Sequence, residues 1–78
     1  MERSYEAFRA LVREDVKKRL ACFELSDEDI DKFLNAEEDQ IKGAYQAYAE
    51  KDPDDMRSDE ARFNGEASTV SMCLEYCY

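Results

Sequence analysis

The stretch LSDEDIDKFLNAEEDQIKGAYQAYAEK, residues 25–51, decides the fold of this 78-residue chain. It opens with Ser26, whose hydroxyl can cap a helix, and Asp29 three residues later completes the acidic form of a capping box. Asp27 and Glu28 also suit the positive end of the helix dipole. The apolar residues that follow recur every three or four positions, which is typical of the buried side of a helix; they are Ile30, Phe33, Leu34, Ile41, Tyr45 and Tyr48.

The same stretch can form two helices or one. The apolar pattern loses a turn at 37–38 and then resumes, and Asn35–Ala36 is a place where the chain can bend. We therefore predict a short helix at about 27–34 and a longer helix at about 36–51. A single helix over 27–51 is the alternative, because the phase of the apolar pattern also fits it.

Helices are predicted on both sides of this stretch. Apolar residues at helical spacing indicate a first helix at about 4–23 and a last helix at about 66–77. Residues 52–65 are acidic, contain the only proline and end in an Asn-Gly turn signal, so we predict a linker there. The fold class is therefore all-α, a small bundle of three to four helices in a single domain, 1–78, because so short a chain buries only one small core.

The charge of the chain is unevenly distributed. The net charge is −9, and residues 23–65 hold fourteen acidic and only five basic side chains. Residues 1–22 hold four acidic and six basic side chains. Direct binding of nucleic acid is disfavoured, because phosphate recognition needs a cationic surface. A basic protein surface is the better partner, since opposite charge accelerates encounter and sets specificity.

Three bases form a ridge on the first predicted helix. Arg9, Arg13 and Lys17 follow one another at intervals of four residues and so share one helix face. The ridge has two interpretations. It is either a solvated helix face or a docking surface for the acidic middle of the chain.

Several chemistries are disfavoured by composition. The chain has no histidine and only two glycines, which removes the commonest general base and any glycine-rich phosphate loop. We therefore predict no enzyme activity, no cofactor and no metal site. A calcium-binding module is a third alternative, because five oxygen-bearing residues match the spacing of an EF-hand loop, although Lys32 stands where that loop needs glycine; the five are Asp27, Asp29, Asp31, Asn35 and Glu38.

The cysteines and the N-terminus bear on location. Three cysteines, an odd number, and the lack of an apolar leader or membrane span indicate reduced thiols in a cytoplasmic protein. Cys73 and Cys77 lie one helical turn apart, and with Cys22 they could supply three thiolates to zinc. We interpret all three as buried thiols that pack as small apolar side chains.

The chain also resembles small helical proteins carried on bacterial phages and other mobile elements. The resemblance rests on LSDEDIDKFL followed by IKGAYQAY, then an acidic linker, then ASTVSMCLEYCY, and it covers residues 25–78 with gaps. It implies an accessory or counter-defence role.

Two functions follow as expectations. The first is a non-enzymatic acidic interaction protein, in concrete form an anti-CRISPR-like inhibitor that occludes a basic nucleic-acid-binding surface of its partner. The second is an assembly protein that forms a homodimer through its aromatic C-terminal helix, with Tyr76 and Tyr78 on the dimer surface. The predicted partner-binding residues are Asp27, Glu28, Asp31, Glu37, Glu38, Asp39, Asp54 and Asp55.

Overall fold

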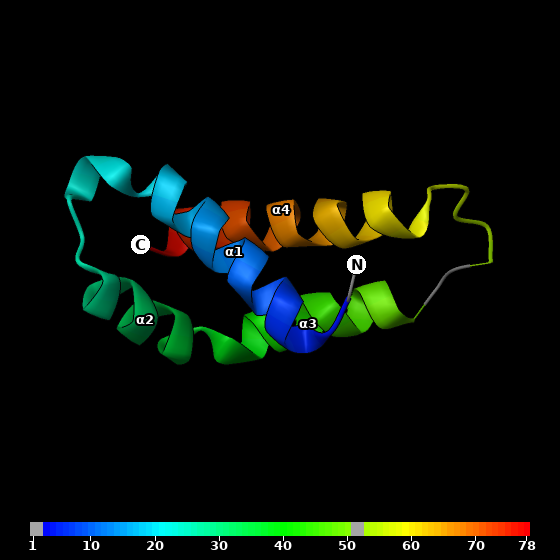
Figure 1. Ribbon diagram of the computed structural model, residues 1–78, viewed down its shortest axis with the longest axis horizontal. Helices are drawn as coiled ribbons and strands as arrows, with labels where there is room; N and C mark the ends of the chain where they lie inside the picture. Colours follow the sequence, from blue (N-terminus) through cyan, green and yellow to red (C-terminus); the bar gives the residue numbers. More distant parts are fainter. Residues whose placement is uncertain (1–2, 51–52) are drawn as a thin grey trace.

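A computed structural model describes residues 3–50 and 53–78 and contains four α-helices (Figure 1). The described residues include no strand, so the predicted all-α bundle is confirmed. The helices are α1 (Tyr5–Arg19), α2 (Asp27–Ala36), α3 (Glu38–Ala49) and α4 (Asp59–Cys77), and the short 3-10 helix η1 (Ala21–Phe23) follows α1.

Three of the four helices start at a serine cap. The Oγ atoms of Ser4, Ser26 and Ser58 each accept a hydrogen bond of 3.1 Å from the backbone N–H three residues later. This bond satisfies one of the free donors in the first turn of a helix. The predicted start of α2 at Ser26 is confirmed.

The central stretch forms two helices, as predicted. The break falls at Glu37, one residue after the predicted bend at 35–36, and the Glu37 N–H still donates to the carbonyls of Phe33 and Leu34. α2 therefore extends two residues beyond its predicted end. The predicted end of the next helix at residue 51 lies outside the described residues, and α3 ends at Ala49.

The predicted linker at 52–65 is wrong over 59–65. Helix α4 starts at Asp59, seven residues earlier than predicted, because Ser58 caps it and because Arg62 and Phe63 are buried. The Asn64–Gly65 pair, which we interpreted as a turn, lies inside the helix. The predicted first helix is also too long: α1 ends at Arg19, and η1 occupies the last residues of the predicted range.

The helices surround one elongated core. α4 packs along α1 and α3. α2 and α3 form one row, α4 lies opposite them, and α1 crosses diagonally between the two (Figure 1). The described part measures 40 × 22 × 19 Å along its principal axes. The core is apolar and aromatic, and it draws on all four helices and on Leu20; its members are Phe8, Val12, Val16, Leu20, Ile30, Leu34, Ile41, Tyr48, Phe63, Ala67, Val70 and Leu74.

One charged side chain is buried beside this core. Arg62 of α4 is only 6 % exposed, and its guanidinium lies over the Tyr48 ring, 5.1 Å from the centroid. Arg62 also donates to the backbone carbonyl of Tyr48 and lies 3.5 Å from Asp59 and 3.7 Å from Asp55. We call Tyr48, Asp55, Asp59 and Arg62 the Arg62 cluster; it fixes the start of α4 and the preceding loop onto α3.

Candidate interaction surface

The basic ridge of α1 lies against the acidic side of α2. Arg13 Nε donates to Asp31 Oδ1 at 2.9 Å, and Lys17 Nζ lies 3.1 Å from Asp27 Oδ1. Arg13 Nη2 also approaches Asp27 Oδ1, at 3.5 Å. Lys17 and Arg13 together lower the pKa of the Asp27 carboxyl, with Lys17 as the main cause.

The first turn of α3 continues this contact toward the start of α1. Arg9 Nε donates to Glu38 Oε2 at 2.9 Å, and Arg9 Nη2 donates to Asn35 Oδ1 at 2.9 Å. The hydroxyl of Tyr5 donates to the other oxygen of Glu38 at 2.8 Å. Arg9 is the main cause that lowers the pKa of Glu38, while burial and Glu38 raise the pKa of Tyr5 to about 12.

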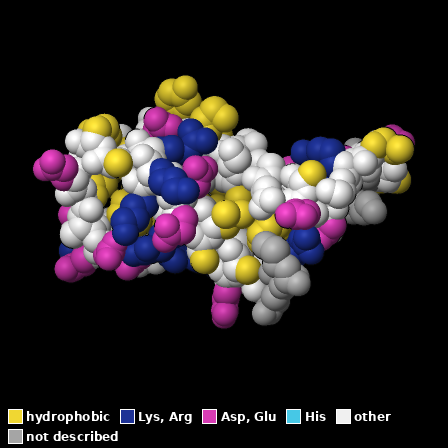
Figure 2. Space-filling model, turned by 45° about the horizontal axis from the view of Figure 1, so that its top comes forward, with side chains coloured by type: hydrophobic (Ala, Val, Ile, Leu, Met, Phe, Trp, Pro, Cys, Tyr) yellow, Lys and Arg dark blue, Asp and Glu magenta, His cyan; other side chains and the backbone are white. Residues whose placement is uncertain are grey.

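These contacts form an antiparallel line of ion pairs, and they support the docking interpretation of the ridge. The line is open to solvent: the side chains of Arg13, Lys17 and Asp27 are 25 %, 49 % and 69 % exposed. Figure 2 shows Lys and Arg side chains interleaved with Asp and Glu side chains over the half of the molecule that holds the end of α1 and α2. We call this line the α1–α2 seam, and it consists of Arg9, Arg13, Lys17, Asp27, Asp31, Asn35 and Glu38.

Two predicted contacts lie in the loop before α4. Asp55 is held by Arg57, whose Nη2 lies 2.7 Å from Oδ2 and whose backbone N–H donates to Oδ1 at 3.0 Å. Arg57 thereby holds the pKa of Asp55 far below its usual range. Asp54 beside it is exposed. Asp55 thus has a structural role in this loop and is less available to a partner than its sequence position suggests.

Three predicted contacts face solvent in whole or in part. Glu28 is exposed and lies 3.5 Å from Lys32 on the same helix. Glu37 is half-buried and accepts a hydrogen bond of 2.6 Å from the Gln40 amide. Asp39 is exposed and forms no ion pair within the described residues. The eight predicted residues therefore do not form one face: they are divided among the seam, the loop and the outer side of α2 and α3.

The ion pairs decide which charge the surface presents. Eight of the ten Lys and Arg side chains in residues 3–50 and 53–78 form an ion pair, and Lys18 and Lys42 are the exceptions. The acidic side chains outnumber their basic partners, so the charge left over is mainly carboxylate. Eight carboxylates in the same ranges form no ion pair: Glu6, Glu24, Asp29, Glu37, Asp39, Glu50, Glu60 and Glu66.

Sequence reasoning left six of these carboxylates out of the predicted contacts: Glu6, Glu24, Asp29, Glu50, Glu60 and Glu66. Glu6 and Glu66 each have an arginine one helical turn away, Arg9 and Arg62, but these arginines pair with other carboxylates. Pairs at i, i+3 and i, i+4 can be counted in the sequence, but the count does not tell which of them form. The long-range pairs of the seam depend on how the helices pack and have no such signal.

The EF-hand spacing does not form a loop. Helix α2 carries four of the five residues: Asp27, Asp29, Asp31 and Asn35. Asp27 pairs with Arg13 and Lys17, Asp31 pairs with Arg13, and Asn35 accepts a hydrogen bond from Arg9. A calcium loop needs a sharp turn at its sixth position, which a helix does not provide. No group of three or more His, Cys, Asp or Glu side chains is placed to hold a metal ion in the described ranges.

The prediction that the thiols are buried is wrong. Cys22, Cys73 and Cys77 are all free and exposed. On α4 the buried apolar positions are Phe63, Ala67, Val70 and Leu74, at intervals of three or four residues. Cys73 directly precedes Leu74 and lies at the edge of this face, while Cys77 continues the spacing at the last residue of α4, beyond the last buried residue.

The two predicted dimer tyrosines have different surroundings. Tyr78 packs on Phe23 and Phe33, with ring centroids 4.9 Å and 5.3 Å apart. Tyr76 is 85 % exposed. Tyr78 therefore closes the end of the bundle, and Tyr76 alone projects into solvent.

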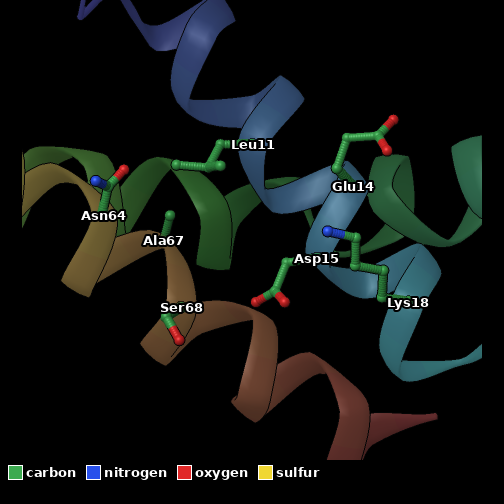
Figure 3. Close-up of a pocket in the computed structure, with 7 residues that line it drawn as sticks. All are labelled: Leu11, Glu14, Asp15, Lys18, Asn64, Ala67 and Ser68. Atoms are coloured by element: carbon green, nitrogen blue, oxygen red, sulfur yellow. The ribbon is translucent and has the colours of Figure 1, made fainter.

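A groove runs between α1 and α4. Its volume is about 220 Å³, and Leu11 and Ala67 supply its apolar lining (Figure 3). Asn64 and Ser68 line it from α4, and Asp15 points into it from α1 (Figure 3). Glu14 and Lys18 complete the wall on the α1 side.

Comparison with known proteins gives no relative from which a role could be inferred: no family model, no curated protein and no solved structure matches the chain. None of the helices in the described residues combines the length and the apolar character that crossing a membrane requires.

Proposed function

We propose that the protein is a non-enzymatic interaction protein that presents carboxylates to a basic surface of a partner. One observation supports this proposal most strongly: the molecule pairs eight of its ten described bases internally, so that its unpaired charge is mainly negative. A surface of this kind repels nucleic acid and attracts a protein that binds nucleic acid.

The concrete form of the proposal is an inhibitor that occludes a nucleic-acid-binding groove, as anti-CRISPR proteins do. The outer side of α2 and α3 is the proposed contact, and its main contact residues are Glu28, Glu37 and Asp39. The seam can add to the contact, because Asp27 and Asp31 are exposed on one side while Arg13 and Lys17 hold them on the other. A partner arginine would then compete with α1 for these carboxylates, and each exposed pair it replaces contributes only about 0.2–1 kcal/mol.

The test uses the partner recovered with the tagged protein from its host cells and then purified. Removal of two charges by Glu37→Gln with Asp39→Asn should weaken binding by about tenfold or more, as loss of two charge-assisted contacts implies. The matched control, Glu60→Gln with Glu66→Gln, removes the same charge from α4 and should change affinity by less than about threefold.

Two further readouts test the inhibitor role. The affinity of the wild type should fall as salt concentration rises, because the contact is electrostatic. The partner's nucleic acid should also displace the protein in competition. Equal weakening by the two double variants, or simultaneous binding of nucleic acid and protein, would contradict the proposal.

A further inference from the structure

The outer side of α4 carries two features that the proposed function does not use. The first is Tyr76, which is 85 % exposed. The second is the groove of about 220 Å³ between α1 and α4, lined by Asn64, Ala67 and Ser68 on the α4 side. A large exposed aromatic side chain and an open groove on the same helix are the pattern of a binding surface rather than of a finished monomer.

We propose that Tyr76 of a second copy occupies this groove, so that two copies form a symmetric dimer through antiparallel α4 helices. Asn64, Ser68, Met72 and Tyr76 succeed one another at intervals of four residues, and all four are exposed. They therefore follow one side of α4. A twofold axis near residue 70 places Met72 opposite Ser68 of the second copy and Tyr76 opposite Asn64 of the second copy.

The tyrosine cannot fill the groove of its own chain. Tyr76 lies twelve residues beyond Asn64, which is roughly 18 Å along a helix at 1.5 Å per residue. In the dimer each copy fills the groove of the other, so the contact is closed and does not propagate into a chain of molecules. The dipoles of the two antiparallel α4 helices also oppose each other favourably.

The lining of the groove fits a phenol. Leu11, beside the nearly buried Ala67, offers an apolar surface to the ring, and Asn64, Ser68 and Asp15 offer polar atoms to the hydroxyl (Figure 3). Asp15 Oδ2 accepts only a 3.2 Å hydrogen bond from Arg19, and a carboxylate can accept several. A buried tyrosine usually satisfies its hydroxyl in this way.

The low charge of α4 between residues 64 and 76 favours contact with a second copy on this helix. Two chains of net charge −9 repel each other, so contact is least unfavourable where charge is low. Between residues 64 and 76 the only charged side chains are Glu66 and Glu75. Glu75 is paired with Arg19 at 3.0 Å, and Glu66 is half-buried.

The dimer should be weak. A tyrosine buries about 150–250 Å², and a standard interface takes about 800 Å² from each partner, so Tyr76 supplies roughly a quarter. Because the copies repel, added salt should strengthen the dimer. Binding to a basic partner should instead weaken as salt is added. The dimer proposal does not depend on the proposed binding of a basic partner.

Sedimentation equilibrium of the full chain in a reducing agent tests the dimer. Tyr76→Ser should raise the dimer dissociation constant by about tenfold or more, as expected for a central aromatic contact. Met56→Ser is the matched control, because Met56 is 94 % exposed and lies in the loop before α4; it should leave the constant unchanged. Ser68→Glu should abolish the dimer, whereas Ala47→Glu on the exposed side of α3 should have only a small effect.

Concentration-dependent NMR shifts locate the contact. The amides of Leu11, Asn64 and Ser68 should shift as the wild type dimerises and should not shift in Tyr76→Ser. A wild type that stays monomeric at millimolar concentration and high salt would overturn the proposal. Equal effects of Tyr76→Ser and Met56→Ser, or shifts confined to Phe23 and Tyr78, would overturn it as well.

Discussion

The α1–α2 seam and the Arg62 cluster use the same kinds of side chain in opposite surroundings. In the seam, the arginines and lysine are 25–49 % exposed, and each can exchange its partner for water. In the cluster, Arg62 is 6 % exposed and has no such exchange available. Exposed ion pairs contribute little to stability, whereas loss of one member of a buried network leaves polar atoms without partners.

The difference suggests separate roles for the two regions. The Arg62 cluster is a structural joint, since it connects the loop before α4, the start of α4 and the end of α3. The seam holds α2 beside α1 at low cost, and its carboxylates stay accessible from the solvent side. A basic partner would therefore act on the seam and on the outer side of α2 and α3, and would leave the cluster unchanged.

The largest expected effect is that of Arg62→Ala. The change removes one of the two cations beside each of Asp55 and Asp59 and leaves the Tyr48 carbonyl without the Arg62 donor, so we expect a loss of about 3–5 kcal/mol in the free energy of unfolding. Urea unfolding followed by circular dichroism measures it. Arg13→Ala in the seam is the control and should cost at most about 1 kcal/mol. Similar losses for the two variants would remove the distinction between the regions.

Lowering the pH should have the next largest effect on stability, because it protonates carboxylates in both regions. The folded-state pKa values of Asp27 and Glu38 are lowered, so their stabilising effect is present above the unfolded pKa and is lost as pH falls through the folded pKa. The pKa of Asp55 is lowered much further, so its contribution should persist to lower pH. Stability should thus begin to fall below about pH 4.5, near the ordinary pKa of a carboxyl.

Glu38→Gln tests the assignment of this acid loss to the seam. The variant should be less stable than wild type at pH 7, and the difference should shrink as the pH approaches 3. Thermal unfolding between pH 7 and pH 3 measures both quantities. A difference that stays constant over this range would show that Glu38 stabilises the fold without its charge.

The helix caps show how much of the fold the sequence contains. Ser26 was predicted as a cap because three acidic residues and an apolar pattern follow it. Ser58 is also followed by Asp59 and Glu60, but the proline and the Asn64–Gly65 turn signal led us to predict a linker there. Burial of Phe63 against Phe8 and Tyr48, with ring centroids 5.4 Å and 5.2 Å apart, outweighs that local signal. Tertiary packing therefore decides which of the local start and stop signals take effect.

The candidate surface was less predictable than the fold. The excess of acid in residues 23–65 is visible in the sequence, but which acids stay unpaired depends on the crossing of α1 over α2 and α3. Asp31 and Asp39 look alike in the sequence. Asp31 forms an ion pair with Arg13, whereas Asp39 forms none among the described residues.

Ser58→Ala should have an intermediate effect, because it acts on the helix that carries the Arg62 cluster. Loss of the cap should cost about 1 kcal/mol, and Ser26→Ala should cost a similar amount at the start of α2. Hydrogen exchange would distinguish the two variants. Ser58→Ala should expose the amides of 59–62 and Ser26→Ala those of 27–30. An effect of Ser58→Ala as large as that of Arg62→Ala would mean that the cap, rather than the buried guanidinium, holds this joint together.

The smallest expected effect is the coupling between Arg13 and Asp31, and it tests the seam directly. A double-mutant cycle with Arg13→Ala and Asp31→Ala isolates the pair. The contact between Arg13 and Asp27 is lost in both steps that remove Arg13, so it cancels in the cycle. We expect about 0.2–1 kcal/mol at low salt and a value near zero at about 1 M salt, where the Debye length falls to about 3 Å. A coupling well above this range, or one that salt does not reduce, would make the seam a rigid structural element like the Arg62 cluster. Its carboxylates would then be too firmly held to serve a partner, and the outer side of α2 and α3 would have to supply the contact alone.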